Sequence, residues 1–209
     1  MDHYSGMMMG RYSATLRVYS GFLWHADEIC IRILKQEWYL FAVMCGTNRF
    51  ILSYGISTTK FGFDPARLFA EAAARAVSLP RILITDGLLA FIPAAKKVFY
   101  RSAGPRFVHV REIHPHNQFN QNNVHERLNG EFKDRLDHIR GMRADSPSVV
   151  SLMITHHNFF RPHAGIGDRT PAEAAGIEIV PPEPGAESQS REAWITFIQN
   201  AALHAAAAA

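Results

Sequence analysis

Three hydrophobic segments between residues 26 and 54 have the length and the pattern of β-strands. In the first, Asp27, Ile29, Ile31 and Ile33 stand at alternate positions, and alternate side chains of a strand point to the same face. The large aromatic residues in or beside these segments are expected in the core; they are Trp24, Trp38 and Phe41. The predicted strands are 26–34, 37–45 and 49–54, with a turn at 46–48.

Helical and extended segments alternate after these strands. Asp64 and Pro65 fit an N-cap and a first-turn proline, so we expect a helix over 66–78. Three further elements are expected, a short apolar strand, a helix bent at its proline and a fifth strand, over 81–87, 88–100 and 106–113. Strands that are followed by alternating helices and strands are typical of an α/β domain built around one sheet.

The second half of the chain has mainly helical patterns. A polar loop over 114–123 leads into the longest predicted helix, 122–142. Thr170–Glu173 is a capping box with proline at the first helical position, and this short helix is expected to stop at Gly176. The remaining elements are a helix over 146–160, a linker over 180–190 and a helix with an alanine tail over 191–209.

Composition limits the class of protein. Among 209 residues, 47% are hydrophobic and 20% are charged, which is ordinary for a globular protein. The pI near 9.0 leaves room for a polyanionic partner. Because no apolar run approaches the roughly 18 residues that cross a bilayer and no signal-peptide core is visible, we expect a cytoplasmic protein without a membrane partner. Cys30 and Cys45 form no Cys-x-x-Cys pair and are expected to be small buried side chains.

Three acidic residues stand where carboxylates often have a function. Asp27 begins a row of isoleucines, Asp86 follows an apolar strand, and Glu126 lies on a helix. Mg²⁺ prefers oxygen ligands and keeps several waters, so few carboxylates suffice, and two such ions can serve phosphodiester chemistry. Each acid also has a structural interpretation: Asp27 as a turn residue, Asp86 as an N-cap and Glu126 as a first-turn residue. Glu28 competes with Asp27, although the isoleucine row favours Asp27.

The helix over 122–142 has two distinct faces. Glu126, Lys133 and Arg140 are seven residues apart and share one face, so the acid can project into a site while the basic residues line a path for a phosphate backbone. Arg135 falls at the edge of the other, apolar face. That face consists of Val124, Leu128, Phe132, Leu136, Ile139 and Met142.

Four blocks of the sequence together resemble a known family. They are WHADEICIRI, ITDGLLAFIPAAKKVFY, NNVHERLNGEFKDRLDHIRGM and HHNFFRPHAGIGDRTPAEAAGI. Their order and spacing are similar to those of the acid-triad (Asp-Asp-Glu, DDE) transposases of prokaryotic insertion sequences. The resemblance implies an RNase H-like fold, in which a five-stranded mixed sheet with its first three strands antiparallel is flanked by helices.

The same resemblance implies a site and a reaction. Asp27, Asp86 and Glu126 would be the catalytic acids and would bind Mg²⁺ or Mn²⁺, as two ions. The implied chemistry is cleavage at the ends of an element, followed by attack of a 3′-hydroxyl on double-stranded target DNA. A homodimer or larger assembly at the nucleoid is implied as well. Candidates for contact with DNA phosphates are Lys133, Arg135, Arg140, Arg143 and Arg161.

The resemblance covers residues 22–177 as the catalytic domain. We expect 1–21 to be a short N-terminal remnant without the helix-turn-helix region that such transposases usually carry, and 178–209 to be a linker with an alanine-rich helical tail. Cys45 stands where the family typically has Asp, and His157 where it has Tyr.

Other functions compete with an active transposase. One alternative is an inactive relic that only binds DNA or dimerises, and another is a cellular RNase H-like nuclease. A zinc site among His114, His116, His156, His157 and His163 is disfavoured because no cysteine pair or suitably spaced histidine pair supports it.

Overall fold

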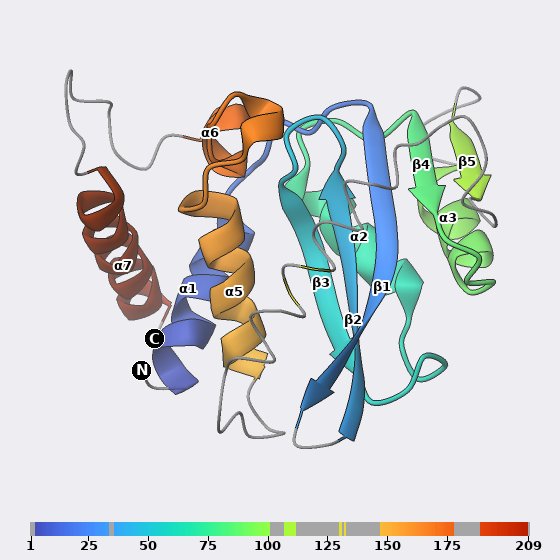
Figure 1. Ribbon diagram of the computed structural model, residues 1–209, viewed down its shortest axis with the longest axis horizontal. Helices are drawn as coiled ribbons and strands as arrows, with labels where there is room; N and C mark the ends of the chain where they lie inside the picture. The colour runs from blue at the N-terminus through green and yellow to red at the C-terminus, as the bar shows by residue number, and fades with distance from the viewer. Residues whose placement is uncertain are drawn as a thin grey trace. The chain divides into compact units, whose positions relative to one another are not determined.

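The computed structural model describes residues 3–33, 36–100, 107–111, 130, 132, 147–177 and 189–208 (Figure 1). The chain divides into two compact units, of which one combines Met1–Val18 with Ser146–Ala209 and the other comprises Tyr19–Asp145. Both candidate acids that the structure describes, Asp27 and Asp86, belong to the second unit.

A five-stranded mixed sheet forms the centre of unit Tyr19–Asp145 (Figure 1). The strand order is β3-β2-β1-β4-β5. Strands β1, β2 and β3 are successive antiparallel neighbours, whereas β4 is parallel to β1 and β5 is parallel to β4. The predicted α/β class and the antiparallel arrangement of the first three strands are therefore confirmed. The strands are β1 Leu23–Ile33, β2 Gln36–Cys45, β3 Ile51–Ser57, β4 Ile82–Thr85 and β5 Val108–Arg111.

Strand β1 begins three residues earlier than the sequence pattern predicts. Its first residues pair with β4, from Leu23 opposite Ile82 to Ala26 opposite Thr85. Trp24, His25 and Ala26 are all buried. A strand segment that is buried on both faces shows no alternation of polar and apolar residues, so the pattern does not reveal it.

Two helices of this unit, α2 (Pro65–Arg75) and α3 (Phe91–Phe99), pack against each other. The Asp64 side chain accepts a hydrogen bond from the Ala66 N–H at 2.9 Å, which confirms the predicted N-cap of α2. The predicted bend in the second helix is wrong, because α3 begins at Phe91 and its proline falls in the first turn. The N–H groups of a first turn have no partner within the helix, so proline is tolerated there.

Aromatic rings form the core between these helices and the sheet. Trp24 meets Phe99 edge to face at 5.7 Å between ring centroids, and Phe69 contacts Phe99 at 5.4 Å. Trp24 and Phe41 are fully buried, as predicted, whereas Trp38 is only half-buried. Cys45 is buried too, but Cys30 is exposed, and the expectation that both are buried is wrong for it. Strand alternation puts Cys30 on the face opposite its buried neighbours Ile29 and Ile31.

The unit of Met1–Val18 and Ser146–Ala209 is helical. Helix α1, which the sequence analysis did not predict, contacts both α5 and α7. The capping box is present, with Thr170 accepting from the Glu173 N–H while Glu173 accepts from the Thr170 N–H, and Gly176 follows at φ +75°. None of the described helices combines the length and the hydropathy that a membrane crossing needs. The elements are α1 His3–Thr15, α5 Pro147–Phe159, the 3₁₀ helix η2 Ala164–Ile166, α6 Pro171–Ala174 and α7 Gln189–Ala207.

Candidate active site

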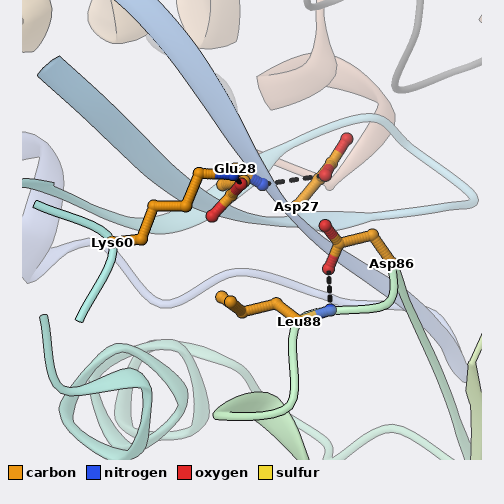
Figure 2. Close-up of polar contacts among 5 residues, drawn as sticks. All are labelled: Asp27, Glu28, Lys60, Asp86 and Leu88. Atoms are coloured by element: carbon orange, nitrogen blue, oxygen red, sulfur yellow. Dashed lines mark hydrogen bonds and ion pairs between the residues drawn. The ribbon is translucent and has the colours of Figure 1, made fainter. Parts of the chain in front are cut away.

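Two carboxylates meet where the parallel pairing of β1 and β4 ends. The last residue pair of these strands is Ala26 opposite Thr85, and the next residue on each is an aspartate, Asp27 and Asp86. Adjacent strands lie about 4.8 Å apart, so residues in matching positions are neighbours. In Figure 2 the Asp86 carboxylate lies beside the Asp27 side chain, and the charge of Asp27 acts on Asp86. The sheet register thus brings together residues that are far apart in the sequence.

Backbone N–H groups orient both carboxylates. The N–H of Glu28 donates to Asp27 Oδ1 at 2.8 Å, and the N–H of Leu88 donates to Asp86 Oδ1 at 3.1 Å (Figure 2). The second bond forms a turn of the kind that Asp favours after a strand. Asp86 is not the N-cap of α3, because that position belongs to Ala90. Asp27 lies inside β1 rather than in a turn.

Burial and a neighbouring like charge both disfavour the ionised form of Asp86. Burial raises the pKa of the Asp86 carboxyl above its ordinary value, and the negative charge of Asp27 raises it further. The hydrogen bond from Leu88 and the positive charges of Lys60 and Arg111 act in the opposite direction but do not cancel the rise. A carboxyl group with a raised pKa beside a like charge is stabilised in its ionised form by a bound cation.

Glu28, the acid next to Asp27, is bound to a different residue. Lys60 of the loop after β3 donates a hydrogen bond to Glu28 Oε1 and forms an ion pair with it (Figure 2). The Lys60 ammonium also lies over the ring of Tyr39, at 5.4 Å from its centroid. Consecutive strand residues point to opposite faces, so Glu28 and Asp27 diverge. The acid that faces Asp86 is Asp27.

Strand β5 adds polar residues on the far side of Asp86. Thr85 Oγ1 is 2.9 Å from His109 Nε2 and also donates to the carbonyl oxygen of Asp86 at 3.1 Å. Arg111 donates to the Gly87 carbonyl at 3.4 Å. Burial lowers the pKa of His109, and the charge of Arg111 lowers it further. These residues were not predicted from the sequence, although the alternation of β5 places His109 and Arg111 on one face.

The donor set suits a hard divalent cation. Asp27 and Asp86 supply carboxylate oxygens, which Mg²⁺ prefers and of which it needs few. Among the described residues, no three acids, histidines or cysteines gather into a metal-binding group. Glu126, the predicted third acid, lies outside the described residues. The pair supplies two carboxylates, and the addition of Glu126 as a third stays a prediction.

The predicted DNA-binding residues lie mostly outside the described part of the chain; these are Lys133, Arg135, Arg140 and Arg143. Phe132, the one apolar-face residue of that helix which the structure describes, is helical and buried, as the predicted face requires. Arg161 is half-buried and follows α5 in the other unit. In that unit the rings of His157 and His163 pack edge to face at 4.7 Å.

No protein-family model and no curated protein sequence matches the chain. Solved structures do match it. A chain of the simian T-cell lymphotropic virus intasome in complex with PP2A regulatory subunit B56 gamma has a TM-score of 0.57 and 15% sequence identity. The match covers 83% of the present chain, which spans only 60% of the length of that one.

Two further matches are isolated catalytic core domains of retroviral integrases. The HTLV-2 integrase core in complex with magnesium has a TM-score of 0.53 at 14% identity, with 78% of this chain and 99% of that chain covered. The BIV integrase core has a TM-score of 0.53 at 19% identity, with 74% and 93% covered. These similarities show that the chain has the RNase H-like fold of the integrase catalytic cores.

Proposed function

We propose that this chain is the catalytic domain of a DDE transposase of insertion-sequence type, which cleaves DNA ends and transfers them to a DNA target. The observation that carries the proposal is the position of Asp27 and Asp86, one residue beyond the last pair of two adjacent parallel strands. The four sequence blocks support the insertion-sequence assignment, and the integrase-like fold supports chemistry on DNA.

Asp27 and Asp86, with Glu126 as the third acid, would hold Mg²⁺ or Mn²⁺, as two ions. The HTLV-2 integrase core was solved in complex with magnesium, which supports this choice. When bound, the ions supply activation of the attacking hydroxyl and stabilisation of the leaving oxygen. The N–H groups of Glu28 and Leu88 hold the acids in fixed orientations. Lys60 and Arg111 offset part of the negative charge at Asp86.

The partner in this proposal is double-stranded DNA, both as element ends and as target. Lys133, Arg135, Arg140, Arg143 and Arg161 would contact its phosphates. Synapsis of two ends requires a homodimer or a larger assembly. A protein with this function works in the cytoplasm, at the nucleoid.

Calorimetric titration with Mn²⁺ tests the proposal without knowledge of the element ends. Wild-type protein should bind Mn²⁺, and Asp86→Asn and Glu126→Gln should lose most of the binding heat. Glu71→Gln is the matched control, because Glu71 is an exposed acid of α2 that pairs with Arg67 on the same helix. With Mn²⁺ present, the wild type and Glu71→Gln should transfer an oligonucleotide 3′ end into a plasmid. Asp86→Asn and Glu126→Gln should lose this activity. Absence of Mn²⁺ binding by the wild type would favour the inactive, DNA-binding relic.

A further inference from the structure

The loop after β3 carries a lysine and a bare aromatic ring beside the acid pair. This segment, Thr58–Phe63 (the 58–63 loop), connects β3 to the N-cap of α2. Phe61 is 93% exposed, more than any other large hydrophobic side chain in the described part of the chain. A single exposed hydrophobic residue is common on protein surfaces and does not by itself indicate a binding site. The exposure of Phe61 becomes informative only together with the other residues of the loop.

The loop is fixed at its end by stacking. The ring of Phe63 lies flat on that of Phe41, with centroids 4.3 Å apart and an interplanar angle of 3°. Gly55 makes room for it, since a Cβ at this position would lie 2.3 Å from the Phe63 ring. Thr59 closes the turn by accepting from the Gly62 N–H at 3.0 Å. Phe61 is therefore displayed on an ordered turn.

Lys60 ties the same turn to strand β1 through Glu28. Its ion pair with Glu28 joins the loop to β1, one residue from Asp27 (Figure 2). Its positive charge also acts on the Asp86 carboxyl. The Lys60 side chain is still 42% exposed, so further donors of the ammonium can reach a ligand. Glu28 and Asp27 leave β1 on opposite faces, but the charge of Lys60 still reaches Asp86. The loop thus presents a cation and an aromatic ring on consecutive residues, within electrostatic range of the proposed site of chemistry.

We propose that the 58–63 loop binds an unpaired nucleotide beside the scissile phosphate, with its base stacked on Phe61 and its phosphate held by Lys60. This inference rests on the proposed function and names the form of DNA that the site accepts. Aromatic rings next to basic residues are the usual means of binding single-stranded nucleic acid, because every base has a face that can stack. Bases inside an intact duplex are already stacked and offer no face to Phe61.

The test compares two short duplexes that differ at one end, blunt in one and frayed by non-complementary bases in the other. The unpaired 3′ base of the frayed probe is 2-aminopurine, whose fluorescence is quenched on stacking. Wild type should bind the frayed probe more tightly and quench it. Phe61→Ala should abolish the quenching and weaken frayed-end binding about 5- to 100-fold, with blunt-end binding unchanged. Tyr19→Ala, at an exposed aromatic residue, should behave like the wild type.

A separate measurement tests the phosphate contact of Lys60. Lys60→Ala should reduce the slope of log affinity against log salt by roughly 0.7 for the frayed probe, the value for one phosphate contact to a single strand. Lys97→Ala, at an exposed lysine of α3, should leave the slope unchanged.

Equal quenching and equal frayed-end preference in wild type and Phe61→Ala would overturn the inference, while Mn²⁺ and duplex binding would leave the proposed function standing. A change of oligomeric state in Phe61→Ala, with quenching retained, would overturn it in favour of a protein contact. Failure of the wild type to bind either duplex would overturn the inference together with the proposed function.

Discussion

Asp27 and Asp86 lie in matching positions on two adjacent parallel strands, each one residue beyond the last paired residues. Because backbone pairing sets this position, the two carboxylates stay close even though their charges repel. Burial, and after it this repulsion, raise the pKa of Asp86 above its ordinary value. A site that is strained by like charges when empty, and relieved by a cation, is expected to gain stability from metal binding.

Asp86→Asn should therefore stabilise the metal-free protein. The amide removes the repulsion but keeps an oxygen to accept the Leu88 N–H. The gain in free energy of unfolding should be below about 1 kcal/mol, because the half-buried carboxylate is screened by solvent. That corresponds to at most about 2–4 °C in Tm. With Mn²⁺ present, the Tm of the wild type should exceed that of Asp86→Asn, because bound Mn²⁺ stabilises only the wild type.

The pH dependence of this difference has a definite sign. The pKa of Asp86 is higher in the folded protein than in the unfolded chain, so the folded protein binds the proton more tightly. Wild-type stability should fall, relative to that of Asp86→Asn, as the pH rises from about 4 through the raised pKa. The difference in free energy of unfolding between the two proteins should be largest at neutral pH and vanish in acid. A gap that does not change with pH would contradict this origin.

Asp27→Asn should lower the pKa of Asp86. The Asp27 charge is one cause of the rise, and its removal leaves burial as the main one. Carboxyl NMR titration of the metal-free protein measures this directly. Glu71→Gln should leave the titration of Asp86 unchanged, since Glu71 pairs with Arg67 on α2. An unaltered pKa in Asp27→Asn would mean that the two carboxylates do not interact.

The sheet was predictable because its strands carry local signals. The isoleucine row of β1 shows the alternation of a strand with one face in the core, and Ile29 and Ile31 are buried as that pattern requires. Asp64 and Pro65 mark the start of α2 by chemistry that acts within a few residues. Helix α1 was missed because its contacts are with α5 and α7, which are distant in sequence.

The surroundings of the acid pair were not predictable from pattern. Lys60 lies in a loop without periodicity, and its partner Glu28 is 32 residues away. The contact between Thr85 and His109 depends on the register of β4 and β5. Such contacts are set by tertiary structure, and no signal within a short window of sequence reports them.

Lys133→Ala should weaken DNA binding and lower its salt dependence. Lys133 lies outside the described residues, and this prediction rests on the helix face that it shares with Glu126. Loss of one phosphate contact should reduce the slope of log affinity against log salt by about 0.9 for duplex DNA, with Mn²⁺ binding intact. Lys97→Ala serves as the comparison. An unchanged slope would refute the phosphate contact.

Gly55→Ala should destabilise the protein and release the 58–63 loop together. The added Cβ would lie 2.3 Å from Phe63, so the ring must leave its stacked position on Phe41. Overpacking of this kind costs about 1–3 kcal/mol. Val77→Ala is the control, because Val77 is an exposed side chain outside the loop and outside the turn of Asp86. If the loop works as an ordered turn, Gly55→Ala should lower the Tm and also abolish the frayed-end preference, even though both Lys60 and Phe61 remain. A lower Tm with the preference retained would show that the stacking of Phe63 does not position the loop for DNA.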